Sequence, residues 1–245
     1  MRTLAVCGDA GASGSASGLC GAPRRAGVSG SGESLFDFSR NGVRIVCVAD
    51  YFSAIEQGRF GALLFDCDGT LAETADLHHF AVAAAIRKLG YEMPKEWYLE
   101  RTGLNLELLL QEFKEVCGRV IGRDEIAPLE EQLFRENLGM IREVEAVVEL
   151  ARKYSGKLPM AVVSSSTQAM VSATLEALKI ANLFSAVVTV EKVARPKPAP
   201  DGYLEAARLV KVDPRRCLAL EDSEQGLEAA RRAQMTAWDI RSLRA

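Results

Sequence analysis

After Gly156 the sequence alternates between short apolar runs and helical segments, and this rhythm constrains the fold more than any other feature. The apolar runs are LPMAVVS (158–164), SAVVTV (185–190), CLALE (217–221) and TAWDI (236–240). Helical patterns separate them, beginning at about Thr167, Asp201 and Ser223. Such alternation is typical of βαβ units, whose strands lie parallel in one sheet. We therefore predict an α/β fold built on a parallel sheet.

An earlier apolar run, GALLFDCDGT (61–70), ends in acids and a glycine and predicts one more buried strand of this sheet. From about Asp76 to Tyr154 the pattern is helical, and no convincing strand interrupts it. Its apolar stripes are Phe80, Ala83, Ala84, Ile86 and Leu89, followed by Leu106, Leu109, Leu110 and Phe113. We therefore predict a core of residues 59–75 and 146–245, split by a helical subdomain over residues 76–145.

The N-terminal segment differs in composition from the rest of the chain. Residues 1–33 are dominated by Gly, Ala and Ser, which bury too little apolar surface to order a chain. We expect residues 1–58 to form a largely disordered extension, whose removal up to about Gln57 leaves activity unchanged. Three origins remain open: a transit peptide, a start codon assigned too far upstream, or a cloning remnant.

Composition excludes several classes of function. The formal net charge is -3 and the pI is near 5.6, so no broad basic surface for nucleic acid is expected. The six cysteines are scattered without a CxxC pair, which argues against disulfides or a zinc site and for a reducing compartment. No apolar run reaches the roughly 20 residues of a membrane-spanning helix. We expect a cytoplasmic protein, or an organellar one if the first 50 or so residues are a transit peptide.

Polar residues follow the predicted strands, at the sheet edge where ligands bind in α/β proteins. Asp66 and Asp68 end the first strand, so one carboxylate can act as a nucleophile while the other reaches a leaving group. Gly69 permits the turn. An acidic turn without a function is the alternative, because short motifs carry false matches.

Two further segments suit a phosphate group. Ser164, Ser165 and Ser166 follow a strand and precede a helix, where hydroxyls and backbone amides can hold phosphate oxygens, although serine there is usually an N-cap. Lys197 lies between Pro196 and Pro198, which restrict the backbone, and its charge would neutralise a phosphoryl group. An exposed loop lysine is ordinarily only solvated.

An acidic pair, Glu221 and Asp222, ends the strand CLALE. Adjacent buried acids are unfavourable unless a cation or hydrogen bonds compensate them. Together with Asp66 they would form a hard oxygen site, which suits Mg²⁺. The only histidines are His78 and His79, so a histidine-rich zinc site is not expected.

The ordered set of motifs resembles the haloacid dehalogenase superfamily over about Arg59 to Leu243. The resemblance implies a Rossmann-like core with a helical cap that closes over small substrates. It also implies Asp66 as the nucleophile, Asp68 as the acid and base, Ser164 as a phosphoryl ligand and Lys197 as the balancing charge. Mg²⁺ would be held by Asp66, by the Asp68 carbonyl and by Asp222, with Glu221 as a ligand or behind one. Gly69, Thr70, Ser165 and Ser166 would contribute to phosphate and substrate binding.

Within the superfamily, RPKPAPD (195–201) and EDSEQGLEAA (221–230) resemble the β-phosphoglucomutase-like branch, and the whole resembles bacterial fructose-1-phosphate phosphatases. Mutases of the branch carry a cap arginine after a glycine, whereas Leu104 to Glu107 follow Gly103 here without one, which favours hydrolysis. His78 stands where the mutases have a hinge histidine, so a phosphomutase remains the alternative. His78 and Asn105 are candidate substrate contacts, although either could be an ordinary helix residue.

These patterns together predict a Mg²⁺-dependent phosphatase acting on a small phosphorylated metabolite, such as fructose 1-phosphate, through an aspartyl-phosphate. A non-catalytic binding protein on the same fold is a weaker alternative, because fold alone does not fix function. We expect no nucleic-acid or membrane partner, and a monomer or a weak homodimer.

Overall fold

A computed structural model describes residues 48–243, with side chains from Tyr51 onward. The central sheet has five parallel strands in the order β5-β4-β1-β6-β7. The strands are β1 (Ala62–Phe65), β4 (Met160–Val163), β5 (Ala186–Val188), β6 (Cys217–Glu221) and β7 (Thr236–Asp239). Every strand predicted from the apolar runs is present, and the parallel sheet is confirmed.

The register of the sheet brings the motif-bearing strand ends to one edge. Phe65, the last residue of β1, pairs with Val162 of β4 on one side and with Leu220 of β6 on the other. In this register the carboxyl ends of β1, β4 and β6 lie beside one another along the sheet. The residues that follow β1, β4 and β6 therefore emerge side by side at the carboxyl edge.

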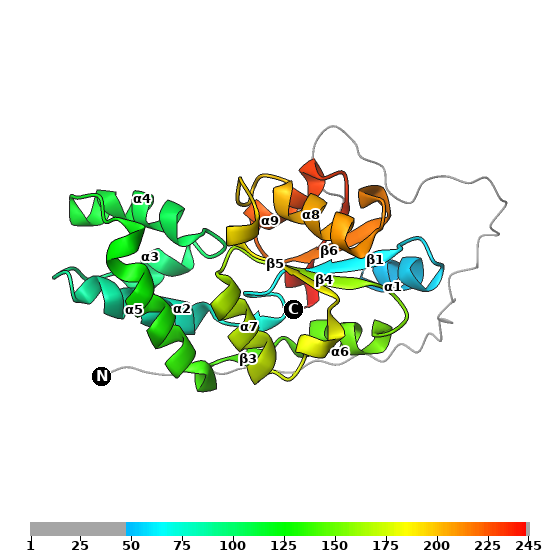
Figure 1. Ribbon diagram of the computed structural model, residues 1–245, viewed down its shortest axis with the longest axis horizontal. Coiled ribbons are helices and arrows are strands. Elements are labelled where there is room, and N and C mark those ends of the chain that lie inside the picture. Colours follow the sequence, from blue (N-terminus) through cyan, green and yellow to red (C-terminus); the bar gives the residue numbers. More distant parts are fainter. Residues whose placement is uncertain (1–47, 244–245) are drawn as a thin grey trace, which may run out of the picture. The chain divides into compact units, whose positions relative to one another are not determined.

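Helices cover both faces of the sheet. Figure 1 shows α8 (Asp201–Val210) and α9 (Glu224–Arg232) on one face, and α6 (Glu145–Tyr154) and α7 (Gln168–Ala177) on the other. Successive strand residues point to opposite faces, and in β1 Ala62 and Leu64 join the cluster under α8 and α9. Short 3-10 turns complete the core at η1 (Leu138–Met140), η2 (Ala181–Leu183), η3 (Val190–Lys192), η4 (Pro214–Arg216) and η5 (Ile240–Leu243).

The helical cap follows β1 in the chain. Its helices are α2 (Ala75–Arg87), α3 (Lys95–Leu99), α4 (Leu106–Cys117) and α5 (Arg123–Glu136). Leu109, Leu110 and Phe113 are buried in its own hydrophobic core, as their spacing predicts, whereas Phe80 is 41% exposed. Two short strands that the sequence analysis missed, β2 (Ala72–Glu73) and β3 (Arg142–Glu143), pair antiparallel at the base of the cap.

The described residues open with a helix that the sequence analysis missed, α1 (Val48–Glu56). Tyr51 stacks on Trp238 of β7 with ring centroids 4.4 Å apart, and its Oη donates to the Ala237 carbonyl at 3.0 Å. Ala54 and Ile55 are also buried. The prediction of disorder up to residue 58 is therefore wrong for residues 48–58, because the spacing of Tyr51, Ala54 and Ile55 gives this helix one apolar face. The rest of that prediction, on residues 1–47, lies outside the described residues.

Among residues 48–243, no helix combines the length and the apolar character needed to cross a bilayer.

Candidate active site

Asp66 and Lys197 form the centre of the site at the carboxyl edge of the sheet. Asp66 directly follows β1, its amide donates to the Leu220 carbonyl at 3.0 Å, and its side chain is buried. The Nζ of Lys197 donates to Asp66 Oδ1 at 2.7 Å and to the Val163 carbonyl at 2.9 Å. The Lys197–Pro198 peptide bond is cis. A loop lysine is thus buried at the end of the sheet rather than solvated.

Glu221 holds this lysine in place. Its carboxylate is fully buried, and Oε1 accepts hydrogen bonds from Lys197 Nζ and from the Oη of Tyr203, the latter at 2.8 Å. Oε2 accepts from the hydroxyl and the amide of Ser223, at 3.0 and 3.3 Å. Four donors therefore occupy the Glu221 oxygens, which suits an anchor for Lys197 better than a direct metal ligand.

The charges at this centre are unbalanced. Burial raises the pKa of Asp66 well above its ordinary value, Glu221 adds to the rise, and Lys197 only partly opposes it. Burial disfavours the charge on Lys197, but Asp66 and Glu221 outweigh burial and raise the pKa of its ammonium. Oxygens of Asp66, Glu221 and Asp222 lie within 4.8 Å of one another. An excess of negative charge on hard oxygen atoms fits a divalent cation such as Mg²⁺.

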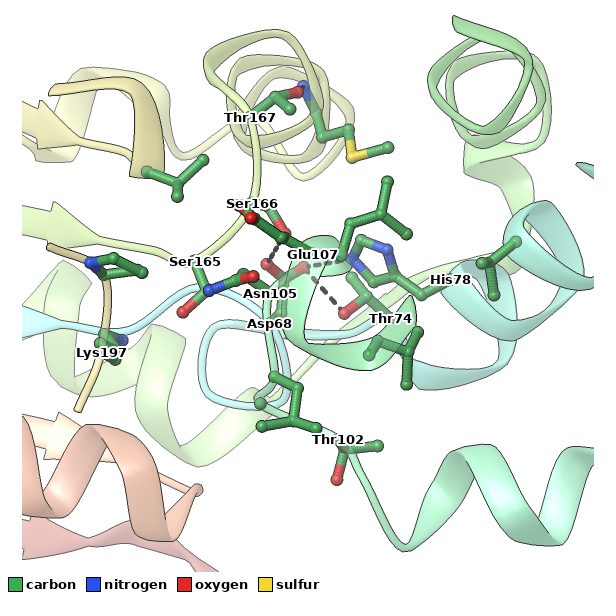
Figure 2. A pocket seen from close by; sticks show the side chains of 18 of the residues that line it. Asp68, Thr74, His78, Thr102, Asn105, Glu107, Ser165, Ser166, Thr167 and Lys197 are labelled. Atoms are coloured by element: carbon green, nitrogen blue, oxygen red, sulfur yellow. Dashed lines mark hydrogen bonds and ion pairs between the residues drawn. The ribbon is translucent and has the colours of Figure 1, made fainter. Parts of the chain in front are cut away.

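Asp68 lies among Thr74, His78 and Ser166, and Figure 2 shows its carboxylate directed toward them. Its Oδ1 lies 2.9 Å from Thr74 Oγ1 and 3.0 Å from His78 Nε2. Its Oδ2 accepts from Ser166 Oγ at 2.7 Å and from Ser164 Oγ at 3.1 Å. Burial works to raise the pKa of Asp68, but the charge and hydrogen bond of His78 outweigh it and hold that pKa well below its usual range. The reciprocal attraction to Asp68 raises the pKa of His78 despite burial, so the two form an ion pair.

The turn after Asp68 holds Asp222. Gly69 has φ +86°, and a Cβ there would collide with the Asp222 carboxylate, so glycine is required for the close approach. Thr70 Oγ1 donates to Asp222 Oδ1 at 3.2 Å. Thr70 is fully buried and does not line the cavity. In this structure Thr70 positions Asp222, and its part in phosphate binding stays a prediction.

The three serines after β4 divide between two environments. Ser165 and Ser166 line the large cavity, as predicted, but Ser164 does not. Ser164 is buried, donates to Asp68 and accepts a hydrogen bond from the Ser166 amide at 3.0 Å. The strand end therefore brings Ser164 to the site, with its hydroxyl engaged by Asp68 rather than directed into the cavity.

A cavity of about 710 Å³ lies above this centre, between the core and the cap. Asp66, Asp68, Lys197 and Asp222 line its core side, and α4 and α5 contribute to its cap side. Asn105 lines it too, although Asn105 Oδ1 accepts from the Leu108 amide at 3.0 Å and caps α4. Its Nδ2 has no partner among the described residues, so that atom is the one left for a substrate. The volume suits a small metabolite.

Three residues of the site escaped the sequence analysis: Thr74, Tyr203 and Glu130. Thr74 and Tyr203 lie a few residues beyond the predicted motifs and complete the hydrogen bonding of Asp68 and Glu221. Glu130 lines the cavity from α5 and is 7% exposed. Burial raises the pKa of Glu130 to about 7, although His78 and Arg123 lower it. Its position, four residues from both Ile126 and Phe134, places an acid within an apolar stripe and was the available indication.

Comparisons with known proteins agree with this geometry. Residues 63–239 match the protein family described as haloacid dehalogenase-like hydrolase. The chain is 30% identical to the fructose-1-phosphate phosphatase YqaB of Escherichia coli over 185 residues, which are 76% of this chain and 98% of that protein. It is 31% identical to hexitol phosphatase B of Escherichia coli, over 71% of this chain and 80% of that protein.

Among solved structures, CbbY from Rhodobacter sphaeroides in complex with xylulose-(1,5)bisphosphate superimposes with a TM-score of 0.67 at 27% identity, covering 73% of this chain and 84% of that one. The family match covers well over half of the chain, and it includes Asp66, Lys197 and Asp222. The resemblance inferred from the motifs is confirmed. This chain belongs to the haloacid dehalogenase-like hydrolases.

Proposed function

We propose that the protein is a Mg²⁺-dependent phosphatase that hydrolyses the monophosphate of a small sugar, such as fructose 1-phosphate, through an aspartyl-phosphate. The observation that carries the proposal is the buried contact of 2.7 Å between Lys197 Nζ and Asp66 Oδ1 on the floor of the cavity, beside Asp222. A carboxylate oriented by a buried ammonium suits attack on an anionic phosphoryl group, whose charge the ammonium balances.

In the first step, an Asp66 oxygen bonds to phosphorus and the bond from phosphorus to the sugar oxygen breaks. Asp68 protonates the departing oxygen, so Asp68 must first leave His78 and Thr74, whose contacts hold its pKa low, and take up a proton. The water of the second step renews that proton for the next turnover. In the second step Asp68, now a carboxylate, takes a proton from water, which attacks the aspartyl-phosphate and frees Asp66 and inorganic phosphate. Ser165 and Ser166 line the cavity, which supports a part for them in binding the phosphoryl oxygens, and Ser166 would do so once Asp68 has released its hydroxyl.

The metal would be held by the Asp66 and Asp222 carboxylates and by the Asp68 carbonyl, with Glu221 behind them. When bound, Mg²⁺ supplies positive charge to the transferring phosphoryl group. The protein's own part is to hold two carboxylates close together, which Gly69 and Thr70 achieve for Asp222.

The test measures inorganic phosphate released from a panel of sugar phosphates with Mg²⁺ or with a chelator. Asp66→Asn is expected to lower phosphate release by at least about 10³-fold, because the nucleophile is lost. Asp76→Asn is the matched control, since Asp76 is an exposed cap residue paired with Lys95. Metal-independent release, or full activity in Asp66→Asn, would contradict the proposal. Absence of release from any phosphate ester would favour a binding protein instead.

A phosphomutase is the second candidate, and the contact of 3.0 Å between His78 and Asp68 at the hinge favours it. A mutase would convert β-glucose 1-phosphate into glucose 6-phosphate with little free phosphate. Both products can be followed in the same incubation. Net phosphate release without formation of glucose 6-phosphate would contradict the mutase and support hydrolysis.

A further inference from the structure

The cap side of the cavity is unusually acidic for a pocket that receives an anionic substrate. The cap contributes three carboxylates and one guanidinium to the lining: Glu107, Glu130, Glu131 and Arg123. One of the carboxylates is committed elsewhere, because Glu131 accepts a hydrogen bond from Thr167 Oγ1 of the core at 3.0 Å. The other basic groups of the cavity, His78 and Lys197, are engaged by Asp68 and Asp66.

Glu130 stands apart from the other two carboxylates because it is buried. Its exposed fraction is 7%, and its helical neighbours Ile126 and Phe134 are 1% and 0% exposed. No residue between 51 and 243 donates a hydrogen bond to its carboxylate, and Arg123, the cap arginine that lines the cavity, is itself exposed. A buried carboxylate without a hydrogen-bond donor is unfavourable for folding. Because Glu130 lines the cavity, a ligand bound there would supply the hydrogen-bond donors that its carboxylate lacks.

The chemistry of such a ligand follows from the charges. Hydroxyl groups donate hydrogen bonds to a carboxylate, whereas a second phosphate or a carboxylate of the ligand would meet like charge in a site of low dielectric. When the core binds the phosphate group of a sugar or polyol phosphate, the substrate still has several hydroxyls directed toward the cap. A bisphosphate would instead need a cluster of cations at the cap end. Among the described residues that line the cavity from the cap, Arg123 is the one arginine or lysine, and His78 is engaged by Asp68.

We propose that Glu130 selects the substrate class: it accepts hydrogen bonds from the hydroxyls of a sugar or polyol monophosphate and rejects bisphosphates and phosphorylated carboxylic acids. This proposal rests on the phosphatase function and deepens it. Glu107, in the first turn of α4, also lines the cavity and adds negative charge to it. The specificity therefore has a repulsive component as well as an attractive one.

The test compares matched substrates on the purified full-length protein at pH 8, where Glu130 is ionised because its pKa is about 7. The substrates are fructose 1-phosphate, fructose 1,6-bisphosphate, 2-phosphoglycolate and the generic ester p-nitrophenyl phosphate. The wild-type protein is expected to prefer fructose 1-phosphate to either doubly acidic ester by at least about 100-fold in kcat/KM, because like charges are placed together in the cap. Comparable kcat/KM for the bisphosphate would overturn the proposal. Failure to hydrolyse any of the four esters would refute the phosphatase itself, whereas hydrolysis of p-nitrophenyl phosphate without a preference for fructose 1-phosphate would refute only the proposed selection.

Variants then assign the preference to one residue. Glu130→Gln is expected to raise the KM for fructose 1-phosphate about tenfold, from the loss of a charged hydrogen bond, and to narrow the preference over the bisphosphate. Glu130→Lys should lower the ratio of kcat/KM for fructose 1-phosphate to that for the bisphosphate still further. Glu115→Gln, an exposed change on α4 outside the cavity, should leave the ratio of the two kcat/KM values unchanged. An unchanged ratio in a folded Glu130→Gln protein would overturn the assignment, and the wild-type comparison stands if that variant fails to fold.

Discussion

The burial of Glu130 has a consequence for stability that can be measured without any substrate. Burial raises the pKa of Glu130 to about 7 from an ordinary 4.5, with His78 and Arg123 opposing the rise. An acid whose pKa is higher in the folded state binds its proton more tightly there than in the unfolded chain. Well below pH 4.5 Glu130 is protonated in both states, so its burial costs no free energy of ionisation. As the pH rises toward 7 the unfolded chain gains free energy from ionising this group, and the folded state loses stability relative to it. The difference amounts to about 3 kcal/mol above pH 7.

Glu130→Gln replaces the carboxylate by a neutral group of the same shape. We expect the variant to be more stable than the wild-type protein by about 3 kcal/mol at pH 8, but by only about 1 kcal/mol at pH 5. In a domain of this size the gain corresponds to a melting temperature about 6 to 12 °C higher. The comparison cancels the other titrating groups of the site, because both proteins contain them.

Thermal unfolding of both proteins, followed by circular dichroism at pH 5 and at pH 8, measures the effect. Urea unfolding at the same two pH values serves if heating proves irreversible. Glu115→Gln, an exposed change on α4, controls for the general effect of removing one negative charge. An equal difference at both pH values, or a less stable variant at pH 8, would refute the assignment of a raised pKa to buried Glu130.

Three further changes test other parts of the structure. Gly226→Ala would drive a methyl group into the buried Glu221 carboxylate, and the overlap should outweigh the gain in helix propensity, lowering stability by about 1–3 kcal/mol and reducing kcat. Tyr51→Ala removes the ring stacked on Trp238 and should cost about 3–5 kcal/mol in the free energy of unfolding, measured with urea. Adding Mg²⁺ to chelator-treated protein should raise the melting temperature, because ligands that bind only the folded state stabilise it, and Asp222→Asn should diminish that rise.

Each of these predictions has a control. Gly139→Ala introduces a methyl group into open space and should leave kcat unchanged. Phe80→Ala removes an aromatic ring that is 41% exposed and should cost clearly less than Tyr51→Ala. Equal stability and kcat of Gly226→Ala and Gly139→Ala would show that the packing assigned to Gly226 is wrong. Equal free energies of unfolding of Tyr51→Ala and Phe80→Ala would show the same for Tyr51. An equal response of Asp222→Asn and wild-type protein to Mg²⁺ would show that the metal binds elsewhere.

The parts of the fold and site that the sequence predicted are those determined by local pattern and chain topology. An apolar run ending in a polar residue marks the end of a buried strand, and parallel strands bring their ends to one edge, so Asp66, Ser164 and Glu221 were expected together. Lys197 was expected at the same edge from its proline-flanked loop and the family order of motifs. The structure places all of them there.

The direction of a side chain and its partners in another element could not be predicted in the same way. Ser164 and Thr70 stand where the motifs place them, but their hydroxyls bind Asp68 and Asp222. Phe80 belongs to an apolar stripe and yet lies exposed, because the packing of α2 against α5 decides which face is covered. Glu130 becomes a site residue only through that same packing.

The stacking of Tyr51 on Trp238 also bears on how this protein should be produced. β7 is one of the two edge strands of the sheet, and Tyr51 of α1 supplies the ring over its tryptophan and a donor for one of its carbonyls. A domain cut to the family match at residue 63 would lack α1 and would leave Trp238 uncovered beside an unprotected strand edge. Edge strands with exposed apolar side chains recruit further strands from neighbouring molecules. Such a fragment is therefore expected to aggregate, and a soluble preparation needs the chain from Val48 onward.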